Sequence, residues 1–196
     1  MLNALSTIIV VLCWFVYLPM FLGKSSPGTE RKRSDPLSRI GIAFHAAGVV
    51  VMWGWRRPLF SPLGIFSFPT DIVAPLAAIL IAAGSVWFSW ISLKTLGQQW
   101  SFVAGVTAEH QLVQSGPYAV VRHPLYSCFF GLTLATGLVW TERAGLAIAL
   151  IPFWIGVWIR VRTEEKTLRD TFGAEFDDYV RRVPAFFPRV WEEKNK

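Results

Sequence analysis

The feature that most limits what this chain can fold into is a series of long apolar runs. A helix needs about 20 mostly apolar residues to cross the hydrocarbon core of a bilayer. The mean hydropathy of +0.43 is also well above that of a soluble domain. We therefore predict an all-α, polytopic membrane protein with about five transmembrane helices. The expected spans are residues 2–22, 40–55, 72–93, 124–140 and 144–159.

The segment from residue 160 onward has a different composition from the spans. It carries nine basic and eight acidic residues. Apolar side chains recur in it every three or four positions, which indicates an amphipathic helix. We expect a C-terminal helical tail at the membrane surface, broken in two at Gly173. The recurring side chains are Leu168, Phe172, Phe176 and Tyr179.

The distribution of basic residues predicts the orientation of the chain. Five spans place the loop 23–39, the connection 94–123 and the tail on one side. That side holds most of the lysine and arginine, so the positive-inside rule makes it cytoplasmic. The N-terminus is then outside and the C-terminus inside. The opposite side carries Arg56, Arg57 and Arg143.

Cysteine and histidine do not form a recognisable framework. Cys13 and Cys128 both lie inside apolar runs, without disulfide or metal-ligand spacing. The three histidines, His45, His110 and His123, are scattered, and we expect no metal. The net charge of +6 reports cytoplasmic loops, so we expect no nucleic-acid partner. His45, inside a predicted span, is either bonded to a neighbouring helix or part of a site.

The most informative polar stretch is LVQSGPYAVVRHPLY at residues 112–126, between two apolar runs. Pro124 suits the first turn of a helix, which places His123 at or beside the N-cap. A helix N-terminus favours an anionic ligand group, and Arg122 adds a fixed positive charge. Tyr126 adds a ring and a hydroxyl one turn in. The alternative is an ordinary interfacial loop at a membrane boundary.

A second polar group lies at the predicted end of the last span. Arg160 and Glu164 are one helical turn apart, with Glu165 next to them. The alternative interpretation is snorkelling side chains with surface ion pairs. Because Pro124 begins one span and Arg160 ends the next, both groups belong to the same membrane face. We therefore predict that the two groups meet.

Four blocks in this order resemble the isoprenylcysteine carboxyl methyltransferase family, a broad group that includes phospholipid N-methyltransferases. The resemblance covers roughly residues 90–190. It implies S-adenosylmethionine as methyl donor, in a pocket roofed by the 94–123 loop and closed by the tail. The blocks are LGQQWS (96–101), LVQSGPYAVVRHPLY (112–126), Arg160-x-x-x-Glu-Glu165 and FGAEFDDYVRRVPAFFP (172–188).

The resemblance also implies roles for individual residues. Arg160 is expected beside the methyl acceptor, and Glu165 is expected to hold the cofactor as well as to serve catalysis. Arg122 suits the carboxylate of the donor, and Glu164 or Glu165 suits its ribose and amine. The remaining cofactor-binding residues implied are Leu112, Gly116, Tyr118, Val121, His123, Pro124 and Tyr126.

The chain then divides into two parts of one integrated domain. Residues 1–93 hold three helices and a basic loop, and residues 94–196 hold the cofactor-binding loop, a transmembrane hairpin and the tail. The acceptor is expected to be lipophilic or small, possibly a prenylcysteine-like carboxylate, entering from the surrounding lipids. Two alternatives are an NADPH-dependent membrane reductase of the sterol reductase type and a non-catalytic membrane scaffold.

Overall fold

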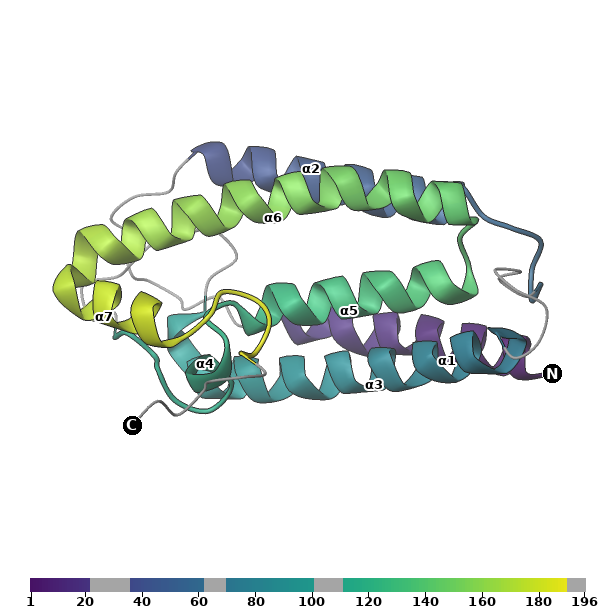
Figure 1. Ribbon diagram of the computed structural model, residues 1–196, viewed down its shortest axis with the longest axis horizontal. Helices are drawn as coiled ribbons and strands as arrows, with labels where there is room; N and C mark the ends of the chain where they lie inside the picture. The colour runs from purple at the N-terminus through teal and green to yellow at the C-terminus, as the bar shows by residue number, and fades with distance from the viewer. Residues whose placement is uncertain (22–35, 62–69, 101–110, 190–196) are drawn as a thin grey trace.

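The computed structural model describes residues 1–21, 36–61, 70–100 and 111–189, and its regular elements in these ranges are helices joined by short loops (Figure 1). The elements, in chain order, are α1 (Leu2–Tyr17), the 3₁₀-helix η1 (Leu18–Phe21), α2 (Pro36–Gly54), α3 (Thr70–Leu96), the 3₁₀-helix η2 (Gly97–Gln99), α4 (Pro117–Val120), α5 (Pro124–Val139), α6 (Arg143–Phe172) and α7 (Ala174–Arg182).

The prediction of an all-α, polytopic membrane protein is confirmed. Within the described ranges, four helical segments are long and apolar enough to cross a membrane: α1 with η1, α2, α3 and α6. The remaining predicted span, the fourth in chain order, is α5, which is shorter, at 16 residues. Most of the predicted basic loop and His110 lie outside the described residues.

The last predicted span does not end near residue 159. Helix α6 continues without interruption for 30 residues, through Arg160 and both glutamates. Its sequence holds neither glycine nor proline between Gly156 and Phe172, so nothing in it breaks the helix. The helix ends at Gly173, whose φ of +51° is a conformation that favours glycine. The predicted break at Gly173 is therefore confirmed, whereas the first part of the predicted tail, residues 160–172, continues the membrane helix.

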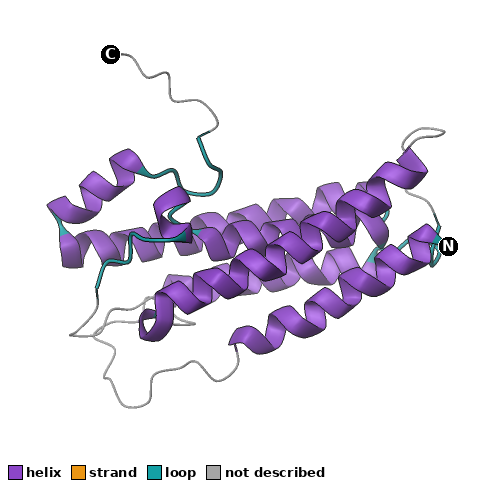
Figure 2. Ribbon diagram, turned by 90° about the horizontal axis from the view of Figure 1, so that it is seen from below, coloured by secondary structure: helices purple, strands orange, loops and turns teal. Residues whose placement is uncertain are grey.

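The long helices run nearly along one axis and form two layers (Figures 1 and 2). Helix α2 packs along α6 in one layer, and α3 packs against α5 and α1 in the other. Helices α5 and α6 are antiparallel, as expected of a hairpin, but α6 has its main partner in α2. The short helices α4 and α7 lie at one end of the bundle, together with the start of α5.

Small residues allow α2 and α6 to approach closely, a common device between membrane helices. A Cβ atom built on Gly156 of α6 would lie 2.7 Å from the carbonyl oxygen of Gly41. A Cβ atom on Gly48 would lie 2.9 Å from the carbonyl oxygen of Ala149. Backbone atoms cannot move aside as a flexible side chain can, so both contacts require glycine.

We expect Gly156→Ala to lower the melting temperature of the purified protein, because the added methyl group separates α2 from α6. Overpacking of this kind costs about 1–3 kcal/mol. Gly84→Ala is the matched control, since Gly84 is also in a helix and a Cβ atom there meets nothing within 4 Å. That control should be neutral or slightly stabilising. Equal melting temperatures for the two variants would contradict this account of the α2–α6 contact.

Candidate functional site

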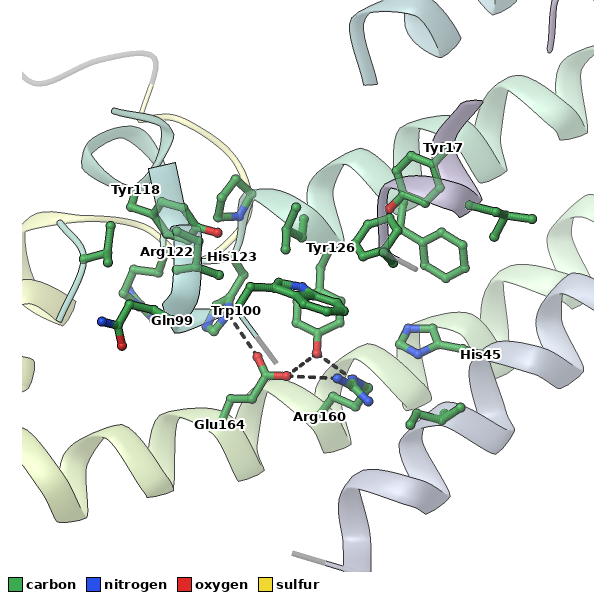
Figure 3. A pocket seen from close by; sticks show the side chains of 18 of the residues that line it. Tyr17, His45, Gln99, Trp100, Tyr118, Arg122, His123, Tyr126, Arg160 and Glu164 are labelled. Carbon is green, nitrogen blue, oxygen red and sulfur yellow. Dashed lines mark hydrogen bonds and ion pairs between the residues drawn. The ribbon is translucent and has the colours of Figure 1, made fainter. Parts of the chain in front are cut away.

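A cavity of about 1090 Å³ lies between the two helix layers, at the end of the bundle that carries α4 and α7. Its polar end is formed by residues around the start of α5 and by the second half of α6. The rest of its wall is largely apolar and comes from α1, η1 and α2. Figure 3 shows the side chains at the polar end converging from these separate elements.

The Arg-His-Pro turn has the local structure that its sequence predicts. Helix α5 begins at Pro124 with His123 as its N-cap residue, which confirms the expected helix start. Two residues of the turn pair with the tail through their backbone: Arg122 N–H donates to Pro184 O at 2.8 Å, and His123 N–H donates to Ala185 O at 2.9 Å. The tail therefore lies against the turn.

A cluster of buried aromatic and apolar side chains holds α7 and the tail in this position. Phe176, Tyr179 and Val183 are buried together, and Leu112 and Leu168 pack against them. The contact joins the tail to α6 and to the segment before α4. The C-terminal segment is thus fixed over the polar end of the cavity by burial as well as by backbone hydrogen bonds.

Glu165 lies between two basic side chains. Arg122 donates to Glu165 Oε1 from Nη2 at 2.7 Å and from Nε at 3.0 Å. His123 Nε2 lies 3.0 Å from the same oxygen. The third donor of Arg122, Nη1, reaches the carbonyl oxygen of Val183 in the tail. Glu165 therefore connects α6, the turn before α5 and, through Arg122, the tail.

Glu164, its neighbour in the sequence, takes part in a separate set of contacts. Glu164 accepts a short hydrogen bond from the Tyr126 hydroxyl. Arg160 donates to that hydroxyl from Nε at 2.6 Å and to Glu164 from Nη2 at 3.3 Å. Arg160 also lies 3.4 Å from the Ser38 hydroxyl of α2. The predicted meeting of the Arg122–Tyr126 turn with the start of the Arg160–Glu165 segment is confirmed.

The structure divides the predicted site residues between the cavity wall and its support. Of the predicted site residues, Glu165, Gly116 and Val121 lie outside the cavity wall. Gly116 has a φ of +58°, and a Cβ atom there would lie 3.2 Å from Thr95 Oγ1. The roles expected of all these residues remain predictions. Those that line the cavity are Leu112, Tyr118, Arg122, His123, Pro124, Tyr126, Arg160 and Glu164.

Tyr118 is a wall residue whose buried hydroxyl is available to bind a ligand. Its ring is 7% exposed, and its hydroxyl has no hydrogen-bond partner among the described residues. Burial raises the pKa of this hydroxyl above its usual range, so it is a neutral donor. The neighbouring Tyr179 hydroxyl, by contrast, donates to Tyr118 O at 2.6 Å. Burial raises the pKa of Tyr179 to about 12.

Several wall residues were not identified from the sequence. Trp100 lies at the polar end and belongs to the LGQQWS block, which had suggested the family but no individual role. Its neighbour in the wall, Gln99, accepts a hydrogen bond from the backbone of Gln111 at 3.3 Å. Trp14 and Tyr17 of α1 also line the cavity. Nothing in the sequence of the first 21 residues distinguishes these aromatics from ordinary lipid-facing ones.

The chemistry available at the cavity is that of charged and hydrogen-bonding side chains. The described residues contain no group of three or more histidine, cysteine, aspartate or glutamate side chains that could hold a metal ion. Cys13 and Cys128 lie outside the cavity wall.

At the polar end the wall carries the carboxylate of Glu164, two guanidinium groups, an imidazole and two phenols. The Glu165 carboxylate contacts Arg122 and His123 from outside the wall. These side chains can bind and orient a ligand that carries a positive and a negative group.

Comparison with known proteins identifies one family. A sequence model of the isoprenylcysteine carboxyl methyltransferase family matches residues 76–170. Protein-S-isoprenylcysteine O-methyltransferase B of Arabidopsis thaliana is 31% identical over 174 residues, which are 77% of this chain and 85% of that protein. The match therefore extends beyond the C-terminal motifs.

Bacterial relatives are similar over shorter segments. A cobalt-zinc-cadmium resistance protein of Cupriavidus metallidurans is 38% identical over 102 residues, 51% of this chain and 46% of that protein. Methanethiol S-methyltransferase 2 of Bradyrhizobium diazoefficiens is 26% identical over 150 residues, 74% of this chain and 57% of that protein. The chain spans about half the length of the first curated relatives that it matches.

Proposed function

Because the chain belongs to the isoprenylcysteine carboxyl methyltransferase family, we propose that it is an integral membrane methyltransferase. It transfers a methyl group from S-adenosylmethionine to a lipophilic or small acceptor. The observation that supports this proposal most strongly is that the Arg122–Tyr126 turn and the Arg160–Glu164 segment line the same cavity. That cavity is polar at one end and apolar along the rest. Its volume of about 1090 Å³ is slightly above the usual range for ligand sites, which leaves room for a cofactor and an acceptor together.

The residues at the polar end fit the cofactor. S-Adenosylmethionine supplies a methyl group on a positively charged sulfur, ready for direct displacement. The protein has to align donor and acceptor, and alignment supplies roughly 7–11 kcal/mol in favourable cases. Glu164, in the wall, is placed for positive and hydroxyl groups of the cofactor, and the first turn of α5 is suited to its carboxylate. Tyr118 offers the unpaired buried hydroxyl that a polar ligand would satisfy.

We expect Tyr118→Phe to weaken S-adenosylhomocysteine binding roughly tenfold, since one hydrogen bond is lost. The melting temperature of the ligand-free protein should stay the same or rise, because this hydroxyl has no partner in the described residues. Tyr179→Phe is the contrasting control: it removes the bond to Tyr118 O and should lower the melting temperature. Unchanged affinity in Tyr118→Phe would remove Tyr118 from the cofactor site.

The apolar part of the cavity supports a lipophilic acceptor. Phe15 and Val50 line it and are also 72% and 69% exposed, so the cavity approaches the lipid-facing surface between α1 and α2. An apolar acceptor can therefore enter sideways from the membrane. Arg160, at the junction of the polar and apolar parts, is placed to orient a carboxylate acceptor. The names of the relatives suggest S-prenylated cysteine and methanethiol as the first acceptors to test.

The orientation in the membrane follows the distribution of basic residues. The polar end of the cavity lies with α7 at one end of the bundle. The basic loop 23–39 and the basic tail both belong to this end by chain order. The positive-inside rule makes this end cytoplasmic, where a water-soluble cofactor is available. The N-terminus is then outside and the C-terminus inside.

The activity is tested by incubating the detergent-purified protein with methyl-tritiated S-adenosylmethionine and each candidate acceptor. Transfer of label to an S-prenylated cysteine or to methanethiol, dependent on the protein, is the expected result. A separate protease-protection experiment in sealed vesicles tests the orientation. The C-terminal tail should be cleaved only when its proposed cytoplasmic side faces the protease. Absence of transfer to these two acceptors and to an extract of membrane lipids would contradict the proposed activity.

A further inference from the structure

His45 is a buried polar residue in the apolar part of the cavity wall. It lies in the middle of α2, lines the cavity, and is 7% exposed. Its Nε2 atom has no hydrogen-bond partner among the described residues. Most buried polar atoms in proteins are hydrogen-bonded, and leaving one unpaired is unfavourable. Among the described wall residues, His45 and Tyr118 each hold a fully buried side-chain polar atom without a hydrogen-bond partner.

The packing of α2 on α6 fixes the position of His45 relative to Arg160. A Cβ atom on Gly156 would lie 3.0 Å from His45 N, so His45 is level with Gly156. A Cβ atom on Gly41 would lie 2.5 Å from Arg160 Cγ, so Arg160 is level with Gly41. Four residues of helix rise about 6 Å. His45 therefore lies about one turn further from the polar end than Arg160. Figure 3 shows Arg160 between Glu164 and His45.

Aromatic side chains hold the imidazole ring in place. The ring stacks on Tyr126 at 6.0 Å between centroids and 15° between planes. The rings of Phe129 and Phe153 meet it edge-on, at 5.5 Å and 5.1 Å. These neighbours fix the ring orientation but do not satisfy Nε2. A purely hydrocarbon ligand in this part of the cavity would leave that atom unpaired as well.

We propose that His45 binds the methyl acceptor, by a hydrogen bond from its imidazole to a second polar group of that molecule. The inference rests on the methyltransferase function proposed above, with the acceptor's reacting group beside Arg160. The second polar group lies about 6 Å from the reacting group, on the way to the apolar tail. The acceptor class is therefore an amphiphile with two polar positions, and His45 selects against a plain fatty chain.

Two ligands of equal chain length test this selection: N-decanoyl-β-alanine and tetradecanoic acid. Both have a carboxylate and a chain of 14 atoms, but only the first has an amide near the required position. We expect the S-adenosylhomocysteine-loaded wild-type protein to bind the amide ligand roughly tenfold more tightly, by calorimetry. That factor corresponds to about 1.4 kcal/mol. In His45→Leu the preference should vanish or reverse, because the amide then has no partner.

His45→Gln is the conservative control, since its amide reaches the position of Nε2 and should retain the preference. S-Adenosylhomocysteine binding, measured in all three proteins, should be the same, because His45 lies away from the polar end. An equal preference for the amide ligand in wild type and His45→Leu would overturn the inference. So would a wild-type protein that binds the amide ligand no more tightly than tetradecanoic acid, or that binds neither ligand. Loss of S-adenosylhomocysteine binding in the wild type would instead contradict the proposed function.

Discussion

Replacing Arg160 by alanine is expected to lower the rate of methyl transfer by roughly 100-fold, because an acceptor that is no longer held in line with the methyl donor loses the benefit of alignment. Arg160 lies at the junction of the polar and apolar parts of the cavity, and its guanidinium contacts both Tyr126 and Glu164. Without it, a carboxylate acceptor has no cation to orient it. Binding of S-adenosylhomocysteine should change much less than turnover.

Arg162→Ala is the matched control for Arg160→Ala. Arg162 lies on the same helix, two residues away, but it is exposed and stacks over the Trp158 ring at 5.3 Å. The control should retain activity within a factor of about two, because the residue faces away from the cavity. Initial rates of label transfer from methyl-tritiated S-adenosylmethionine measure both variants. Full activity in Arg160→Ala would remove Arg160 from the acceptor site.

Replacing Glu165 by glutamine is expected to abolish turnover and to weaken S-adenosylhomocysteine binding at least tenfold. The substitution leaves the largely buried Arg122 without its counter-charge. Breaking a buried ion pair in this way costs about 3–5 kcal/mol. Because Arg122 also holds the tail at Val183, the polar end of the cavity should loosen. Melting temperature and calorimetric affinity measure the two effects.

The control for Glu165→Gln is Glu175→Gln in α7. Glu175 is exposed and accepts a hydrogen bond from Gln114 at 3.0 Å, so the change removes a charge outside the buried cluster. Affinity and melting temperature should both stay near the wild-type values. Tight ligand binding together with normal turnover in Glu165→Gln would show that the contact with Arg122 and His123 is dispensable.

The sequence was sufficient to predict the helices and the start of the site, because both depend on local patterns. The apolar runs identify the spans, and Pro124 identifies the first turn of α5 through its missing N–H group. The meeting of the turn with Arg160 follows from chain order, since one span begins where the next one ends. These are features that neighbouring residues determine by themselves.

Local patterns could not predict which of the two glutamates lines the cavity. Glu164 and Glu165 are adjacent in the sequence, and their side chains point in directions about 100° apart on the helix. Which of them lines the cavity depends on how α6 is rotated, and that is set by its contact with α2. The resemblance directed attention to Glu165, whereas Glu164 is the one in the wall.

The pairing of α2 with α6 also lies beyond the sequence patterns. Gly41, Gly48 and Gly156 are common residues in membrane helices, and only the fold shows that they face one another. The same contact gives His45 its position beside the cavity. From the sequence alone, a bond to a neighbouring helix is the simpler interpretation of His45.

Calorimetric titration with S-adenosylhomocysteine decides whether the polar end of this cavity binds S-adenosylmethionine. We expect saturable binding to the wild-type protein, loss of binding in His123→Ala, and no binding of NADPH to either. Binding of NADPH without binding of S-adenosylhomocysteine would contradict the account and favour a reductase. A folded protein that binds neither ligand would equally contradict it and favour a non-catalytic scaffold.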